Sequence, residues 1–253
     1  MHTEFPLPVN DTYLIFDLHG VLTSKVEMGK QYDEFVAKFL EAQFDMEITK
    51  TREAIKLANN EWLSFWAKAK NLSQEDFTKE YEEANATWAK MILQGKKVHD
   101  YRQFAEFLEY HVPASLCCIF PEVKAVLQEL NQKGIRLILA SSANTRHSTG
   151  VLVGCKILYL FEKIVGMENT KALKSNIAYY EKILEIIDQP AEKCVFIGNS
   201  ITEIELPKKL GMKTVHIMRE IDYSIQDENQ SIAADIVLPD LKELESKLFG
   251  KKG

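Results

Sequence analysis

The chain has 253 residues, of which 46% are hydrophobic and 27% are charged. This length and composition suit one globular domain with a sizeable insertion, or two modest domains, and either can bury a substantial core. The 31 basic and 37 acidic residues give a formal charge of −6 without a basic tract, so we expect neither nucleic acid nor an anionic membrane as a partner. Small molecules or proteins are the expected partners.

The first predicted element is the apolar run Tyr13-Leu14-Ile15-Phe16, which ends at Asp17. Such a short continuous run is typical of a strand that is covered on both faces. A polar turn follows, and from about residue 28 to residue 110 the apolar side chains recur at helical spacing. We interpret three tryptophans of this helical segment as core residues rather than as the wall of a substrate pocket: Trp62, Trp66 and Trp88.

After Pro121 the pattern changes to helices that alternate with strands. A helix that begins near Val123 is expected to end at Gly134, which suits a left-handed cap, and a strand follows over residues 135–140. Further strands are predicted over residues 163–167, 194–197, 213–218 and 234–238. Helices are predicted over residues 178–187, before Gly211 and at the C-terminus. This order predicts a doubly wound, mostly parallel, Rossmann-like α/β sheet, interrupted after its first strand by the helical segment.

The four cysteines form neither a Cys-x-x-Cys pair nor a cluster with nearby histidines. Their spacing argues against a zinc site and a disulfide framework, so we expect reduced, mostly buried thiols. Residues 1–10 lack the basic start and apolar run of a signal peptide, and no stretch of about 18 consecutive apolar residues occurs. We therefore expect a cytoplasmic protein.

Three polar side chains lie at the carboxyl ends of predicted strands: Asp17, Ser141 and Asn199. The carboxyl ends of parallel strands meet at one edge of the sheet, where doubly wound proteins bind their ligands. The sequence therefore predicts a single crevice that contains all three.

Four segments resemble, in order, the four motifs of the haloacid dehalogenase-like (HAD) hydrolase superfamily. Asp17-Leu18-His19-Gly20-Val21-Leu22 is similar to D-x-D-G-[TV]-L, and the strand ending in Ser141 is similar to the second motif. Lys174, followed six residues later by Tyr180, resembles the third motif, and Gly198-Asn199-Ser200-Ile201-Thr202-Glu203 resembles G-D-[ST]-x-x-D. The resemblance implies a HAD-like core domain over residues 1–24 and 111–253, and a helical cap domain over residues 25–110.

The resemblance also implies roles for individual residues. Asp17 would be the nucleophile, because the first acid of the family attacks carbon or phosphorus to form a covalent ester. Ser141, or Ser142 if the strand is one residue longer, would hydrogen-bond the transferred group, and Lys174 would stabilise negative charge. Ser142, Gly20 and Tyr180 are assigned to substrate binding.

Three acidic positions of the family motifs are altered in this chain. His19 stands where phosphatases have their general acid and base, a task that an imidazole titrating near neutrality can perform. An equally good interpretation is a turn histidine held by local hydrogen bonds. Asn199 and Glu203 replace two acids that hold Mg²⁺, so the expected ligands are Asp17, the His19 carbonyl, Asn199 and Glu203, with weakened affinity.

Three functions follow from these residues. The first is a Mg²⁺-assisted phosphatase that acts on a small phosphorylated substrate through a covalent aspartyl intermediate. The second is a metal-independent 2-haloacid dehalogenase-like hydrolase, a branch whose first and fourth motifs also depart from the phosphatase pattern. The third is a catalytically weak or inactive binding protein, which the three altered acids favour and the retained Asp17 and Lys174 oppose.

Overall fold

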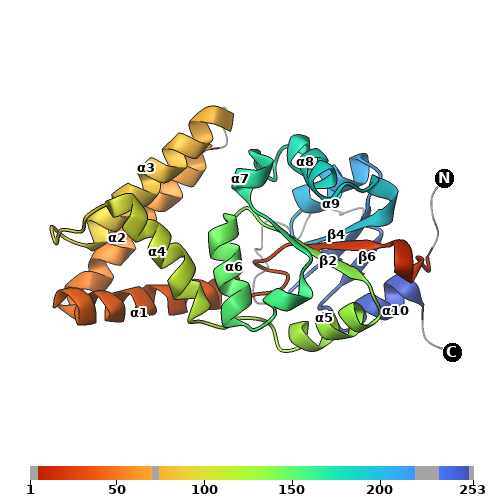
Figure 1. The fold of residues 1–253 in the computed structure, drawn as a ribbon, viewed down its shortest axis with the longest axis horizontal. Helices are drawn as coiled ribbons and strands as arrows, with labels where there is room; N and C mark the ends of the chain where they lie inside the picture. Colours follow the sequence, from red (N-terminus) through yellow and green to blue (C-terminus); the bar gives the residue numbers. More distant parts are fainter. Residues whose placement is uncertain (1–4, 70–73, 220–233, 251–253) are drawn as a thin grey trace.

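The computed structural model of the chain describes residues 5–69, 74–219 and 234–250. Within these ranges six parallel strands form one sheet in the order β3-β2-β1-β4-β5-β6 (Figure 1). The strands are β1 (Tyr13–Phe16), β2 (Arg136–Ala140), β3 (Lys163–Val165), β4 (Cys194–Gly198), β5 (Lys213–Ile217) and β6 (Ile236–Leu238). The predicted fold class is confirmed. The chain reverses its direction of travel across the sheet between β1 and β4, where doubly wound sheets bind ligands.

Helices cover both faces of this sheet. The helices α5 (Val123–Gln132), α6 (Thr145–Gly154) and α10 (Leu244–Phe249) contribute to the hydrophobic core on one face, and α8 (Ile177–Ile187) and α9 (Thr202–Lys209) to the core on the other. A short α7 (Met167–Thr170) follows β3, and single 3-10 turns span Val9–Asp11, Leu158–Leu160 and Ala191–Lys193. Leu14 and Phe16 belong to one core, Tyr13 and Ile15 to the other, which explains the uninterrupted apolar run of β1.

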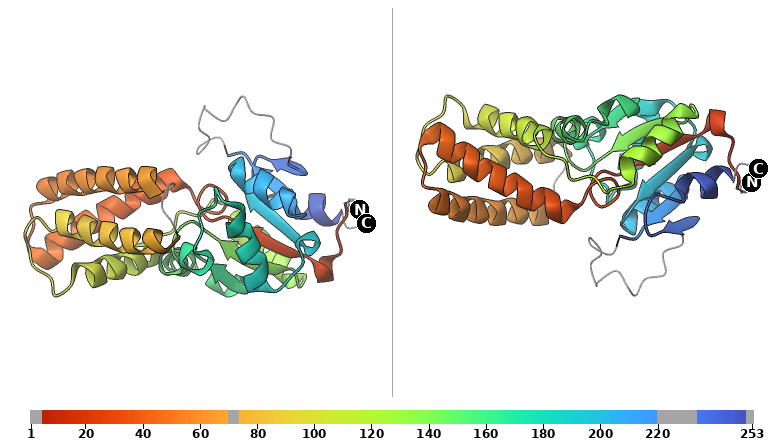
Figure 2. Two further views of the ribbon diagram at one scale, coloured as in Figure 1. Left: turned by 90° about the horizontal axis from the view of Figure 1, so that it is seen from above. Right: turned by 90° about the horizontal axis from the view of Figure 1, so that it is seen from below.

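Four long helices lie between β1 and β2 in the sequence and form a bundle beyond one end of the sheet (Figures 1 and 2). They are α1 (Lys25–Phe44), α2 (Ile48–Ala69), α3 (Gln74–Ile92) and α4 (Tyr101–Ala114). The bundle has its own hydrophobic core, with Val36, Leu40, Ile55 and Leu108 fully buried. The helical character predicted for this segment is confirmed. Because α4 continues past residue 110, the exact domain boundary stays a prediction.

The bundle touches the α/β part where α4 meets α6. Two glycines of α6 permit this close approach: a Cβ atom on Gly150 would lie 2.5 Å from the carbonyl oxygen of Tyr110, and one on Gly154 would lie 2.1 Å from that of Leu116. Both distances are shorter than real contacts allow. Any larger side chain at these positions would push α6 away from α4 and from the segment that follows α4.

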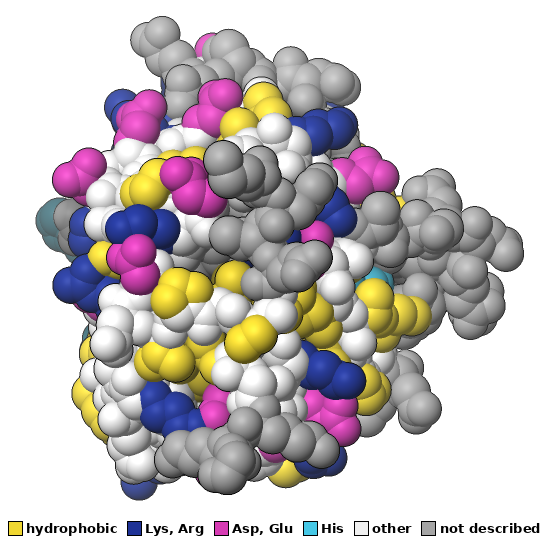
Figure 3. All heavy atoms as spheres, turned by 90° about the vertical axis from the view of Figure 1, so that its right-hand side faces the viewer, with side chains coloured by type: hydrophobic (Ala, Val, Ile, Leu, Met, Phe, Trp, Pro, Cys, Tyr) yellow, Lys and Arg dark blue, Asp and Glu magenta, His cyan; other side chains and the backbone are white. Residues whose placement is uncertain are grey.

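The surface opposite the bundle carries acidic and basic side chains interspersed with each other (Figure 3). All four cysteines are free, and three of them are buried, as predicted: Cys118, Cys155 and Cys194. No helix in the described parts of the chain is both long enough and apolar enough to cross a membrane.

Candidate active site

Asp17 lies directly after β1, at the switch point of the sheet. Its backbone N–H donates to the carbonyl oxygen of Ile197 in β4 (2.9 Å), and its side chain is only 5% exposed. The Nζ atom of Lys174 donates to the Asp17 carboxylate and also to Oε1 of Glu203, at 2.6 Å. One buried ammonium group therefore bridges two buried carboxylates.

Glu203, in the first turn of α9, is held by the loop that precedes this helix. Its Oε2 atom accepts hydrogen bonds from the backbone N–H groups of Asn199 (2.9 Å) and Ser200 (3.2 Å). A Cβ atom on Gly198 would lie 2.6 Å from the Cβ of Glu203, so only glycine allows this approach. Both carboxylate oxygens of Glu203 are thus engaged, and the side chain anchors Lys174 beside Asp17.

Asp17, Lys174 and Glu203 form a buried trio of charged groups. Its electrostatic balance favours protonation of Asp17 as the pH falls. Burial and, second, the charge of Glu203 raise the pKa of Asp17 to about 7, although Lys174 acts to lower it. Burial also acts to raise the pKa of Glu203, but Lys174 and the two backbone N–H groups outweigh it and lower that pKa. Burial opposes the charge of Lys174, yet the two carboxylates raise its pKa. When Asp17 is ionised, the trio therefore carries one excess negative charge.

Glu203→Gln should shift the acidic limb of the pH–rate profile to lower pH. The substitution removes the charge that raises the pKa of Asp17, so Asp17 loses its proton, and can act as a nucleophile, at a lower pH. A profile of hydrolysis rate from pH 5 to pH 9 measures the shift. Glu192→Gln, in a short turn remote from the site, is the matched control. An unchanged limb in Glu203→Gln would show that Asp17 ionisation does not control the rate.

The structure corrects the expectation that Tyr180 binds substrate. Its side chain is fully buried, and its hydroxyl donates to the backbone carbonyl oxygens of Lys174 (3.1 Å) and Thr202 (3.3 Å). Its ring packs edge to face on Phe196 of β4, with 5.2 Å between the ring centroids. Tyr180, six residues after Lys174, lies on the side of α8 that packs into the core. Its hydrogen bond to the Lys174 carbonyl therefore fixes the loop that presents Lys174.

Ser141 and Ser142 follow β2, next to the loop of Asp17. Ser141 is buried, its N–H donates to the carbonyl oxygen of Val165 (3.0 Å), and its Oγ accepts from the N–H of Ala143 (3.1 Å). This geometry leaves the Ser141 hydroxyl proton available for an anion in the crevice. Ser142 is partly buried, and its role in substrate binding stays a prediction.

Gly20 makes room for Asn199, and its assignment to substrate binding stays a prediction. Its φ angle is +93°, and a Cβ atom at this position would lie 2.1 Å from Nδ2 of Asn199. Its N–H donates to the carbonyl oxygen of Thr23 (2.7 Å), which closes its own turn. The first and fourth motifs therefore meet through the Asn199 side chain.

His19 is held by a local hydrogen bond and also lines a cavity, and its role as general acid and base stays a prediction. Its Nδ1 lies 2.9 Å from Oγ1 of Thr23, and its Nε2 lies 3.1 Å from Nε2 of His147 on α6. Burial, followed by the charges of His147 and Lys25, lowers the pKa of His19 well below its ordinary value. The expectation of titration near neutrality is therefore wrong, because His19 stays neutral there. The sequence prediction missed His147. The one signal for it in the sequence is its position in the first turn of the helix that follows the second motif.

The predicted metal ligands form only a weak donor set. Among the described residues no group of three or more acidic, histidine or cysteine side chains is arranged to hold a metal ion. Asp17 and Glu203 share the Lys174 ammonium, and the carbonyl of His19 and the amide of Asn199 add oxygen atoms without charge. These hard oxygen donors suit Mg²⁺ in kind, while the negative charge available to attract it is small.

A cavity of about 470 Å³ lies between the bundle and the carboxyl edge of the sheet. His19, Ala143 and His147 form its floor. Five aromatic residues of the bundle line its walls: Tyr32, Trp62, Trp66, Tyr81 and Trp88. The three tryptophans pack against hydrophobic clusters of the bundle, as predicted, and they also line this cavity, which the prediction did not include. Helical spacing identifies a face of a helix but does not say what covers that face.

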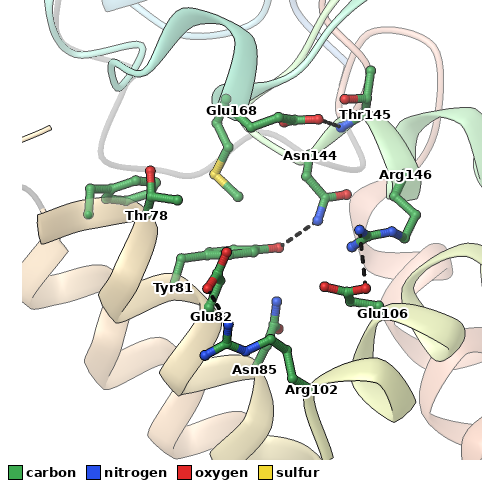
Figure 4. Close-up of a pocket in the computed structure, with 12 residues that line it drawn as sticks. Thr78, Tyr81, Glu82, Asn85, Arg102, Glu106, Asn144, Thr145, Arg146 and Glu168 are labelled. Atoms are coloured by element: carbon green, nitrogen blue, oxygen red, sulfur yellow. Dashed lines mark hydrogen bonds and ion pairs between the residues drawn. The ribbon is translucent and has the colours of Figure 1, made fainter. Parts of the chain in front are cut away.

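A hydrogen-bonded network fastens the bundle to α6 beside this cavity. Glu109 of α4 accepts from Tyr81 and Asn85 of α3, from Nδ2 of Asn144 (2.7 Å) and from Arg146 (3.1 Å). Figure 4 shows the adjoining cavity of about 360 Å³, in which the Tyr81 hydroxyl points toward Asn144. The buried carboxylate of Glu109 therefore already has a cationic partner.

A family model of haloacid dehalogenase-like hydrolases matches residues 12–211. The chain belongs to this family of hydrolases. It is 25% identical over 129 residues to a phosphoglycolate phosphatase of Haemophilus influenzae, which covers 50% of this chain and 58% of the relative. It is 26% identical over 144 residues to a glyceraldehyde 3-phosphate phosphatase of Methanothermobacter thermautotrophicus, which covers 56% and 64%. The chain thus spans less than two thirds of these relatives.

Solved structures share the fold at low sequence identity. A HAD phosphatase from Thermococcus onnurineus superposes with a TM-score of 0.58 at 18% identity, covering 93% of this chain and 96% of the other. The L-2-haloacid dehalogenase from Xanthobacter autotrophicus superposes with a TM-score of 0.57 at 14% identity, covering 92% and 96%. Phosphatases and dehalogenases are similar to the chain to nearly the same degree, so the fold does not distinguish the two activities.

Proposed function

We propose that the chain is a phosphatase that hydrolyses a small phosphorylated metabolite through a covalent aspartyl intermediate. The observation that carries this proposal is the buried Asp17 carboxylate at the switch point of the sheet, in contact with the Lys174 ammonium. The phosphatases among its sequence relatives support the same class of reaction at low identity. A cytoplasmic location, and no binding to nucleic acid or membranes, stay predictions.

The reaction needs a nucleophile, charge stabilisation and one proton transfer in each step. A carboxylate oxygen of Asp17 attacks phosphorus, the bond from phosphorus to the alcohol oxygen breaks, and that oxygen takes the proton of the phosphate monoanion. Water then attacks the phosphorus of the aspartyl phosphate and gives a proton to the neutral imidazole of His19. The bond from phosphorus to the Asp17 oxygen breaks, and the released phosphate takes up that proton. Lys174 and the hydroxyl of Ser141 stabilise the phosphoryl oxygens.

Mg²⁺ belongs to this proposal as a weakly held cofactor. Asp17, the carbonyl of His19 and Asn199 would hold it, and Glu203, the fourth predicted ligand, would reach it only by giving up its bonds to Lys174 or to the backbone. When bound, Mg²⁺ would draw negative charge from the phosphoryl oxygens. Lys174 performs part of the same task, because its ammonium lies against Asp17 and Glu203. We therefore propose that the rate depends on Mg²⁺ less steeply than in a site with three acids.

The second function, metal-independent hydrolysis of a 2-haloacid, is favoured by one specific observation. Lys174 offsets one of the two carboxylate charges of Asp17 and Glu203, and Asn199 adds no negative charge that would attract a metal ion. In that reaction Asp17 would displace chloride from carbon, and water would hydrolyse the resulting ester.

A paired assay tests these functions. Phosphate release from a panel of phosphate monoesters is measured at several pH values with and without Mg²⁺, beside chloride release from short 2-haloacids. Phosphate release supports the phosphatase, and metal-free chloride release selects the dehalogenase. Silence in both assays supports an inactive binding protein and overturns the proposal.

Asn199→Asp should strengthen Mg²⁺ binding by roughly tenfold, because it adds a charged oxygen beside Asp17. Calorimetric titration of Mg²⁺ into the protein without substrate measures this affinity directly. Asn176→Asp, at the exposed N-cap of α8, is the matched control and should leave the affinity unchanged. Equal affinities of parent and Asn199→Asp would show that Asn199 does not face a metal site.

A further inference from the structure

The walls of the 470 Å³ cavity are formed by one face of each bundle helix. Helix α1 contributes Tyr32 and Asp33, α2 contributes Asn59 and Trp62, and α3 contributes Trp88. The floor includes His19, two residues after Asp17, and the Tyr32 ring lies 6.5 Å from the ring of His147. A substrate whose phosphate reaches Asp17 would therefore extend its alcohol part between these aromatic rings.

Asp33 places a carboxylate in the wall of this cavity, and an apolar ligand would not account for it. Both of its carboxylate oxygens accept from Nδ2 of Asn59 at 3.0 Å, and Oδ1 of Asn59 accepts from Nε1 of Trp88 at 2.9 Å. Within the described ranges Asp33 forms no ion pair, whereas Glu109 is paired with Arg146. The amide of Asn59 orients the Asp33 carboxylate but does not neutralise it. Burial raises the pKa of Asp33, as expected of a carboxylate that lacks a cationic neighbour.

Aromatic rings beside an uncompensated carboxylate are the chemistry that binds an organic cation. The faces of tryptophan and tyrosine attract positive charge, and quaternary ammonium groups are typical ligands of such cages. A neutral apolar group would desolvate Asp33 without compensation. A primary ammonium group would need more hydrogen-bond acceptors than one carboxylate, whereas methyl groups on nitrogen pack against the indole rings of Trp62 and Trp88.

Along α1, the lining of the cavity changes from a positive side chain, Lys25, to a negative one, Asp33. A substrate with a phosphate at one end and a cation at the other requires this order. Lys25 begins α1 two residues after Thr23, whose Oγ1 lies 2.9 Å from Nδ1 of His19, and it lines the same cavity, so it lies toward the phosphate end. Asp33 follows eight residues later, which is about 12 Å along a helix axis. A zwitterion with its phosphate at Asp17 and its cation beside Asp33 matches this order of charges.

We propose that this cavity binds the alcohol part of the substrate and that this part carries a methylated ammonium group beside Asp33. The substrate is then the phosphate monoester of a cationic amino alcohol. The identification of the substrate rests on the proposed phosphatase function, whereas the cation site itself does not.

Binding of choline, compared with its neutral isostere 3,3-dimethylbutan-1-ol, tests the cation site without requiring hydrolysis. The chain has three tryptophans, and all three line this cavity, so intrinsic tryptophan fluorescence reports on its occupancy. Choline should bind at least about tenfold more tightly than the isostere. Equal binding of the two compounds, or no binding of either, overturns the proposal whether or not the protein hydrolyses phosphate esters.

Asp33→Asn should remove most of the preference for choline and leave the affinity for the isostere unchanged. Glu34→Gln is the matched control, because Glu34 is the next residue of α1 and pairs with Arg52 and Lys38 on the surface. Retention of the full preference in Asp33→Asn would overturn the role of Asp33.

Hydrolysis of phosphocholine and p-nitrophenyl phosphate by the parent protein separates this proposal from the phosphatase function. A preference for phosphocholine in kcat/KM supports both. Hydrolysis of p-nitrophenyl phosphate together with equal binding of choline and its isostere retains the phosphatase and overturns the cation site. Preferential choline binding without any phosphate release retains the cation site and overturns the phosphatase.

Discussion

Asp17→Asn should reduce hydrolysis by at least about 1000-fold while the fold stays intact, because an amide cannot act as the attacking carboxylate. The substitution keeps the shape of the side chain. It also leaves Lys174 paired with Glu203, which removes the excess negative charge of the buried trio. The free energy of unfolding should therefore change by no more than about 1 kcal/mol.

Steady-state rates and urea unfolding of the same preparation measure both effects of Asp17→Asn. Asp11→Asn is the matched control, since Asp11 forms an exposed ion pair with Lys193 away from the site and should affect neither quantity. A rate for Asp17→Asn within tenfold of the parent would mean that another group is the nucleophile.

The position of the nucleophile was predictable from sequence because local patterns determine it. Four apolar residues covered on both faces must form a central strand, and Asp17 must then emerge at its carboxyl end. The same argument places Ser141 after β2 and Asn199 after β4. The spacing of the fourth motif also brings Glu203 back into the first turn of α9, close to Asn199.

The remaining features depend on how helices rotate and pack, which the sequence pattern leaves open. The spacing from Lys174 to Tyr180 places the tyrosine on a buried helix face, but it does not say whether that face covers the sheet or the site. The same limitation applies to the indole side chains, whose helical spacing fits a core and a cavity wall equally well. His147 meets His19 only because α6 directs its first turn toward the loop after β1. No local signal reports that contact.

The sequence motifs also did not reveal that Lys174 binds both carboxylates. A lysine that stabilises Asp17 alone would be an electrostatic aid to the reaction. A lysine bridging Asp17 and Glu203 is in addition a structural element, because removing it leaves two buried carboxylates without a cationic partner. The stability of the fold and the chemistry of the site are therefore coupled through one side chain.

Lys174→Met should abolish hydrolysis and lower the free energy of unfolding by about 3–5 kcal/mol at pH 8, the usual cost of breaking a buried ion pair. Without Lys174, burial raises the pKa of both carboxyls above the unfolded value of about 4. The folded variant then binds protons that the unfolded chain releases, so its stability falls as pH rises from about 4 through the raised pKa values. In the parent, the lowered pKa of Glu203 adds stability above the unfolded pKa, whereas the raised pKa of Asp17 removes stability as pH rises from about 4 to about 7.

Urea unfolding at pH 5 and pH 8 checks this expected pH dependence, with Lys171→Met as the matched control on the exposed lysine three residues earlier. The deficit of Lys174→Met relative to the control should be larger at pH 8 than at pH 5. Adding Asp17→Asn and Glu203→Gln to Lys174→Met should restore much of the lost stability at pH 8, because the three neutral side chains leave no unpaired buried charge. Activity should stay absent in this triple variant. If Lys174→Met is as stable as Lys171→Met at pH 8, the ammonium group is not held between the two carboxylates, and the charge balance assigned to Asp17 is wrong.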